Sequence, residues 1–206
     1  VRASRSGVPT VAMKLTVGAL YRYFPSKAAL IAALENQVIS QMDEVLKKAV
    51  AAVDSAENQP DLKTVCLARI VSAAYAYRGR LHTAPQQMRL IGGLMSNPQP
   101  QLNPADALVV LSNMLGILKT VSDAMDAAVH ENALAPGSSM ERALVTWASL
   151  RGVAETRKLS QHMPDVFDEA SLFRCAVSSL LIGWGADTKV VDRAFIFVLD
   201  TLKETS

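Results

Sequence analysis

The feature that most constrains the fold is the helical spacing of apolar residues along most of the chain. In residues 27–53 apolar side chains recur every three or four positions, which is typical of an amphipathic α-helix. That stripe comprises Leu30, Leu34, Val38, Met42, Val45 and Ala49. No segment alternates apolar and polar residues as a half-buried strand would. We therefore predict an all-α protein with helices at 27–53, 60–80, 85–95, 105–132, 139–162, 167–185 and 188–204.

Helix breakers and capping residues separate these segments. Pro25 interrupts the chain before the first long helix, and Ser26 is a suitable N-cap because its hydroxyl can accept a free backbone N–H. The stretch 96–104 holds three prolines and is predicted to be a loop. The sequence Pro-Gly-Ser-Ser at 136–139 predicts the end of one helix and the cap of the next.

Charge is distributed unevenly along the chain. The first 34 residues carry five Lys or Arg and no Asp or Glu, whereas the remainder carries 16 basic and 19 acidic residues. A positive head on a slightly acidic body indicates that the head meets an anion. A chance run of five charges is the alternative.

An aromatic and basic cluster lies in that head. The sequence TVGALYRYFPSK, residues 16–27, holds three of the chain's 11 aromatic rings and two cations. A short helix over 17–24 would turn its small residues to one face, which lets a helix approach the floor of a DNA groove closely. Tyrosine hydroxyls and cations at the edge of such a helix can bind phosphates. Core packing of Tyr21 and Tyr23 is the alternative.

The longer stretch TVGALYRYFPSKAALIAAL, residues 16–34, resembles the end of the DNA-binding domain of the tetracycline-repressor (TetR) family. That family has a capping Ser or Thr, a recognition helix ending in Leu-Tyr-x-x-Phe, a small turn with Lys, and an apolar helix. The segment TWASLRGVAE, residues 146–155, is similar to the family's core segment around Trp-Ala-x-x-x-Gly. The resemblance implies a bacterial, cytoplasmic transcriptional regulator that acts as a homodimer.

The resemblance also assigns DNA contacts residue by residue. It implies that Thr16, Val17 and Ala19 approach base edges, with Gly18 on the same face of small residues. It also implies that Tyr21, Tyr23 and Lys27 bind the phosphate backbone. Arg22 is implied to contact either a base or a phosphate. A solvated helix start is the alternative for Lys27. The implied partners are double-stranded DNA with a palindromic operator and a small-molecule effector. Repression released by that effector is the implied function.

Two domains are expected: a helix-turn-helix DNA-binding domain at 1–45, and a ligand-binding and dimerisation domain at 46–206. The head departs from the family pattern, because only 15 residues precede Thr16. Lys14 stands where the family has a turn glycine, and Pro9 stands where a helical aliphatic residue is expected. We therefore expect a head without its first helix, either because it is degraded or because the natural chain is longer.

The body offers candidates for an adaptable apolar pocket with a few polar groups. Methionine suits such a pocket because its side chain is flexible and polarisable. The candidates are Arg69, Tyr75, Met88, Met95, Asn113, Met114, Trp147 and Arg151, with Tyr77 and Arg89 nearby in the sequence pattern. They predict an apolar or amphipathic ligand, and ordinary core packing is the alternative for each.

A dimer interface is expected on helices 139–162 and 167–185. Small residues recur on the second helix, and small residues let helices pack closely. The interface candidates are Leu144, Phe173, Ala176, Val177, Leu180, Leu181 and Trp184. Packing within one subunit is the alternative.

Other classes of function find little support in the sequence. The histidines and cysteines lack metal-ligand spacing, so neither a metal nor a cofactor is expected. No common catalytic motif occurs, so no enzyme is expected, although acidic residues lie near His162 in HMPDVFDE. No run of 18 apolar residues occurs, so we predict no membrane span. An interaction scaffold or dimerisation protein with a degraded head is the alternative function.

Overall fold

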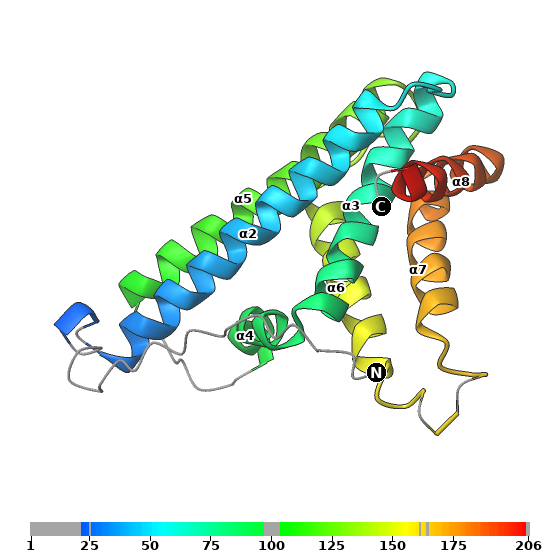
Figure 1. Ribbon diagram of the computed structural model, residues 1–206. Helices are drawn as coiled ribbons and strands as arrows, with labels where there is room; N and C mark the ends of the chain where they lie inside the picture. Colours follow the sequence, from blue (N-terminus) through cyan, green and yellow to red (C-terminus); the bar gives the residue numbers. More distant parts are fainter. Residues whose placement is uncertain (1–21, 25, 97–103, 161, 164, 205–206) are drawn as a thin grey trace, which may run out of the picture.

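The computed structural model describes residues 22–24, 26–96, 104–160, 162–163 and 165–204, with side chains outside 93–106 and 204. Within these ranges every regular element is a helix, which confirms the predicted all-α class (Figure 1). The helices are α2 (Lys27–Ser55), α3 (Leu62–Thr83), α4 (Pro85–Ser96), α5 (Pro104–His130), α6 (Ser139–Thr156), α7 (Glu169–Gly183) and α8 (Thr188–Glu204).

Most helix boundaries follow the capping residues in the sequence. The Ser26 hydroxyl accepts the N–H of Ala29 at 3.1 Å, which confirms the predicted N-cap of α2. Asp168 accepts the N–H groups of Ala170 and Ser171, so α7 begins later than predicted. The helix predicted at 139–162 ends at Thr156, because the following residues continue in turns closed by bonds between residues three apart.

The two longest helices, α2 and α5, lie side by side along one edge of the molecule (Figure 1). Two side-chain hydrogen bonds join them: Asn113 donates to Asn36 at 2.8 Å, and Thr120 donates to Asp43 at 3.0 Å. Both pairs are separated by 77 residues in sequence, so α2 and α5 run in the same direction.

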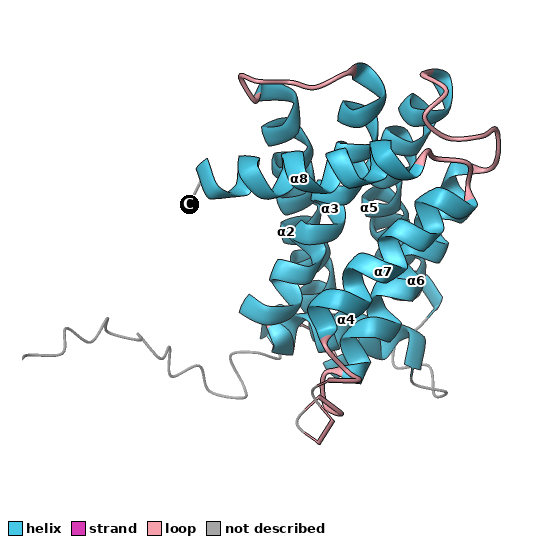
Figure 2. Ribbon diagram, turned by 90° about the vertical axis from the view of Figure 1, so that its right-hand side faces the viewer, coloured by secondary structure: helices cyan, strands magenta, loops and turns pink. Residues whose placement is uncertain are grey.

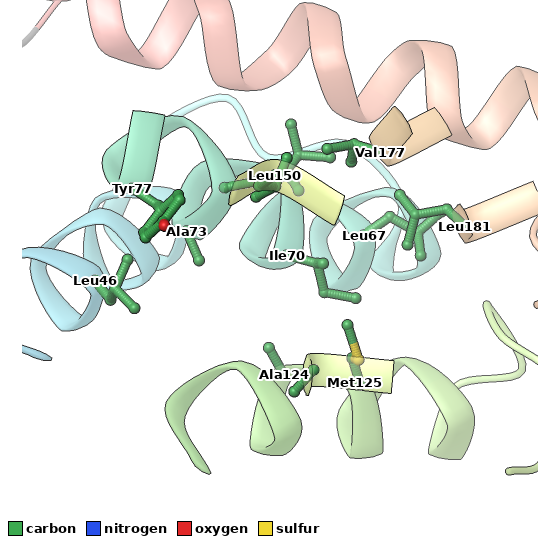
Figure 3. Close-up of a cluster of buried hydrophobic side chains, with 14 of the residues drawn as sticks. Leu46, Leu67, Ile70, Ala73, Tyr77, Ala124, Met125, Leu150, Val177 and Leu181 are labelled. Carbon is green, nitrogen blue, oxygen red and sulfur yellow. The ribbon is translucent and has the colours of Figure 1, made fainter. Parts of the chain in front are cut away.

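Helix α3 is the central helix of the fold. It packs against α2, α4, α5, α6 and α8, and half of its residues are buried. Figure 2 shows α8 crossing in front of α3, with α7 and α6 along the neighbouring face. Figure 3 shows Ile70 of α3 pointing toward Met125 of α5, while Leu67 lies near Leu181 of α7. The core is therefore organised around α3.

The buried face of α2 is rotated relative to the stripe predicted from the sequence. Leu34 is 44% exposed, whereas its neighbour Glu35 is only 3% exposed. The buried positions of α2 are Ala32, Glu35, Val38, Ile39, Met42, Leu46 and Val53. The apolar pattern placed Val38 and Met42 correctly but could not reveal a buried carboxyl group.

Helix α5 contains a stretch, Ala107–His130, that is long and apolar enough to cross a membrane, with a mean hydropathy of 1.4. However, Lys119, Asp123 and Asp126 occupy exposed positions near its middle and in its second half, and charged side chains are costly in a bilayer core. The helix also packs against α2, α3 and α6. In the most apolar part of this stretch 28% of the residues are buried, and a single helix of this kind is weak evidence for a membrane span.

Candidate ligand-binding site

An apolar cavity of about 60 Å³ lies where α2, α3, α4, α5 and α6 meet. Its walls are almost entirely hydrocarbon, because each of these amphipathic helices turns its apolar face inward. The lining residues are Met42, Leu46, Ile70, Ala73, Ala74, Tyr77, Met88, Ile91, Met114, Ile117, Leu118, Val121, Ala143, Thr146, Trp147 and Leu150. Figure 3 shows Leu46, Ala73, Tyr77 and Leu150 reaching this region from α2, α3 and α6.

Few polar groups face the apolar cavity. The Thr146 hydroxyl already donates to the carbonyl of Arg142 at 2.8 Å, so its proton is used within α6. The Tyr77 hydroxyl lies at the α6 side, close to the indole of Trp147 and the guanidinium of Arg151. Burial raises the pKa of this hydroxyl, and the positive charge of Arg151 opposes the shift. Tyr77 is therefore a neutral hydrogen-bonding group at the end of an apolar space.

Three methionines line the apolar cavity from three different helices. Met42 comes from α2, Met88 from α4 and Met114 from α5. Unbranched methionine side chains change rotamer readily and can adapt to the shape of a ligand. The cavity can therefore enlarge by side-chain movement without unpacking the branched residues of α3.

A second and larger cavity, of about 530 Å³, opens beside the first, and we call it the basic cleft. It lies between the end of α3, the start of α4, the end of α6 and the turns that follow α6. Its lining residues are Leu81, Pro85, Met88, Arg89, Arg151, Ala154, Glu155, Arg157, Lys158, Ser160 and Glu169. Four of these side chains are cationic and two are carboxylates.

Arg151 sits between the two cavities in a position set by its neighbours. Its side chain is 22% exposed, and its guanidinium packs against the backbone of α4 at Gly92. A methyl group added to Gly92 would overlap that guanidinium. The nearest carboxylate oxygen, on Glu155, is 3.8 Å away, longer than a direct hydrogen bond. Arg151 therefore presents a held positive charge at the edge of the basic cleft.

A chain of polar contacts forms the far wall of the basic cleft. Glu169 is contacted at one oxygen by His82 at 2.8 Å and by Arg78 at 3.3 Å. Arg157 lies 3.1 Å from the other ring nitrogen of His82. Because an arginine only donates, this contact makes Nδ1 of His82 the acceptor and leaves Nε2–H to donate to Glu169. Glu169 is therefore engaged by residues of α3.

The structure brings together only part of the predicted ligand-binding set. Met88, Met114 and Trp147 line the apolar cavity, and Arg151 lines the basic cleft. The other described candidates are turned elsewhere: Arg69 pairs with Asp54 at 2.7 Å, Tyr75 packs on Phe173 and Phe195, and Asn113 bonds Asn36. We therefore remove those three from the site, while the Met95 side chain lies outside the described residues.

Sequence reasoning missed several lining residues. The sequence pattern places Met42 in the apolar stripe of its helix and gives no sign that Leu46 or Arg157 lines a cavity. Their side chains lie on helix faces that look like ordinary core or ordinary surface, so composition alone gives no sign of a cavity. The packing of α2 against α5 had to be known first.

Most predicted DNA-contacting residues lie outside the described residues, namely Thr16, Val17, Gly18, Ala19 and Tyr21. The three that are described are solvent-exposed. Arg22 and Tyr23 form a helical turn just before Ser26, and Lys27 is the first residue of α2. Tyr23 is 75% exposed, so it is not a core residue of the described structure.

The predicted dimer residues fall into two groups. Leu144 is exposed on α6, and Ala176, Leu180 and Trp184 are half-buried. The side chains of Phe173, Val177 and Leu181 point into the core of their own subunit and are at most 3% exposed. A residue already buried in its own subunit has no surface left for a partner, so we assign these three to the core and not to an interface.

Comparison with profiles of known protein families and with curated proteins gives no match to this sequence. Among solved structures the chain is similar to one described as a protein with unknown function from Rhodococcus sp. RHA1, with a TM-score of 0.60. The sequence identity is 20%, and the match covers 83% of this chain and 79% of that chain. At this identity the likeness shows a shared helical fold alone.

Proposed function

We propose that the protein is a cytoplasmic, ligand-responsive transcriptional regulator of the TetR type, which binds a palindromic DNA operator as a homodimer and releases it when an effector binds. The observation that carries this proposal is the position of α2. Its first residue, Lys27, is the last residue of the aromatic and basic stretch 16–27, part of which resembles the family's recognition helix. About four to five turns further along the same helix, Met42 and Leu46 line the apolar cavity.

The hydrogen bonds between α2 and α5 support a mechanical link between cavity and head. Asn36–Asn113 and Asp43–Thr120 flank the cavity residues Met42 and Met114. A ligand too large for methionine rotamer changes alone would move α2 and α5 together relative to α3, because these bonds join the two helices. Such movement would change the spacing of two heads in a dimer, whose half-sites lie about 34–36 Å apart on DNA. The ligand must bind the two arrangements with different affinities for this to occur.

An interaction scaffold is the second candidate, and one observation favours it. Leu108, Leu111 and Leu115 form an exposed apolar stripe on the first half of α5, and such stripes often mark protein contacts. Under this alternative the head would not bind DNA. The two functions therefore differ in whether the protein binds duplex DNA.

The deciding experiment is selection of bound duplexes from a random DNA library, followed by affinity measurement at several salt concentrations. We expect a palindromic consensus, with affinity that falls as salt rises. Lys27→Ala should weaken binding and lower the slope of log affinity against log salt by about one per subunit. Lys48→Ala is the control, because Lys48 is also an exposed lysine on α2. Absence of salt-dependent duplex binding would favour the scaffold.

A further inference from the structure

Met88 separates the apolar cavity from the basic cleft, and its side chain lines both. It lies on α4, next to Arg89, whose side chain lines the cleft only. A rotamer change at Met88 would therefore join the two spaces into one. The joined site would be apolar at one end and cationic at the other.

The apolar cavity alone is too small for an organic ligand. A volume of about 60 Å³ is well below the roughly 150 Å³ of a protein cavity that accepts benzene. The basic cleft, at about 530 Å³, is within the usual range for ligand pockets. A ligand bound here must therefore occupy the cleft first and extend into the cavity by displacing Met88.

The charge of the cleft selects the sign of the group that occupies it. Each of the two carboxylates in the cleft has cationic neighbours. Glu169 contacts the guanidinium of Arg78, and Glu155 lies 3.4 Å from Lys158 and 3.8 Å from Arg151. Arg89 is exposed and adds a further cationic side chain to the lining of the cleft. The cleft therefore has a surplus of positive charge.

From this arrangement we infer that the effector is an amphipathic carboxylate: its head binds Arg151 and Arg89 in the basic cleft, and its unbranched apolar chain passes Met88 into the apolar cavity. The inference rests on the proposed function, because it names the ligand class of the same site. Arg151 is suited to this role since Gly92 and Tyr77 hold its guanidinium in place. A held guanidinium can bind both oxygens of a carboxylate.

The test uses three probes with the same ten-carbon chain, each measured by calorimetry with the full chain: decanoate, decanol and decyltrimethylammonium. We expect decanoate to bind at least tenfold more tightly than the other two. Hexanoate and octanoate should bind progressively more weakly, with affinity falling about fourfold for each methylene removed. This chain-length series needs no mutation, so it tests burial of the tail even if a variant does not fold.

Arg151→Met tests the head group, and Arg69→Met is its matched control. The two arginines are similarly exposed on helices, with side chains 22% and 26% exposed, but Arg69 is paired with Asp54 outside the site. We expect Arg151→Met to weaken decanoate binding at least tenfold and to leave decanol binding unchanged. Arg69→Met should bind decanoate as the unmodified protein does.

Two results would overturn the inference. One is equal binding of decanoate and decanol, and the other is unchanged decanoate binding by a folded Arg151→Met protein. Binding to duplex DNA, measured in parallel, separates this inference from the proposed function. If the protein binds DNA but not decanoate, the proposed regulatory function stands and the carboxylate effector is rejected. If it binds decanoate but not DNA, only the proposed regulatory function is rejected.

Discussion

The guanidinium of Arg142 lies over the ring of Trp184, 5.5 Å from its centroid, and joins the start of α6 to the end of α7. The same guanidinium donates to the carbonyls of Ala135 at 2.8 Å and Pro136 at 3.3 Å. Ala135 in turn donates its N–H to the carbonyl of Trp184 at 2.8 Å. One buried cation thus fixes the loop between α5 and α6 against the loop between α7 and α8.

Replacing this cation should destabilise the fold. Arg142→Met keeps much of the side-chain volume but removes two charge-assisted hydrogen bonds and the contact with Trp184, so we expect a loss of about 2–3 kcal/mol in the free energy of unfolding. Urea denaturation measures it. Lys119→Met is the control, since Lys119 pairs with Asp123 on an exposed surface and should change the free energy of unfolding much less. Equal losses in the two variants would show that the Arg142 contacts do not stabilise the protein.

Two glycines should respond oppositely to alanine. Gly185 has a φ of +92°, and an added methyl group would meet Ala135 at 3.0 Å. Gly185→Ala should therefore cost about 1–2 kcal/mol of stability, because a left-handed backbone disfavours a side chain. At Gly92 the obstructing atoms are the end of the Arg151 side chain, which the added methyl group would displace from α4 without moving any backbone. Gly92→Ala should leave stability unchanged or raise it by up to about 1 kcal/mol through helix propensity. Thermal denaturation compares them, and equal shifts would contradict the argument.

The buried carboxyl of Glu35 makes stability depend on pH. Burial raises its pKa from 4.5 to about 7, and one of its oxygens has no partner among the described residues. Because the folded state holds the proton more tightly than the unfolded state, stability should fall as pH rises from about 4.5 to about 7, and then level off. The expected loss is about 3 kcal/mol. Urea denaturation at pH 5 and pH 8 measures it.

Glu35→Gln isolates this contribution because glutamine has a similar shape and does not ionise. The variant should lose the decline between pH 5 and pH 8 and be more stable than the unmodified protein at pH 8. Glu44→Gln is the control, because Glu44 is exposed on the same helix and should leave the decline in place. A Glu35→Gln protein with the original pH profile would assign the decline to other groups.

How far the sequence predicts the structure depends on the range of the interactions. Helix positions follow from local periodicity and from caps such as Ser26 and Ser138, so all seven described helices begin within two residues of the prediction. The predicted end of α6 lies beyond the observed one because no proline or glycine occurs between Thr156 and Pro164 to mark the end of the helix. Capping residues and the spacing of apolar residues are local features, so helix positions can be predicted from a single sequence.

The site depends on packing between distant helices, and there prediction was weaker. Arg69 and Arg151 are both arginines on amphipathic helices, yet one pairs with Asp54 and the other borders a cavity. Nothing within a few residues of either distinguishes them. Likewise, Val177 and Leu144 have similar surroundings in sequence, but only Leu144 is exposed. The contrast follows from how α7 packs against α3 and α6, which one sequence does not reveal.

The exposed faces of α6 and α7 give the last prediction, which concerns the proposed homodimer. Met140, Leu144, Ala148 and Gly152 are exposed at four-residue intervals and form one stripe along α6. On α7, Ala176 and Leu180 are half-buried at the same spacing. These stripes carry small and apolar side chains, which suits close helix packing across a two-fold axis. We expect a dimer by sedimentation equilibrium at micromolar concentration.

Leu144→Asp should convert that dimer to a folded monomer, because it places two carboxylates opposite each other near the two-fold axis. Ile196→Asp is the matched control, since Ile196 is 58% exposed on α8, away from these stripes, and should stay dimeric. Val177→Ala should also stay dimeric but lose about 2 kcal/mol of stability, because Val177 is a core residue. A dimer that survives Leu144→Asp but dissociates on Ile196→Asp would move the interface from α6 and α7 to α8.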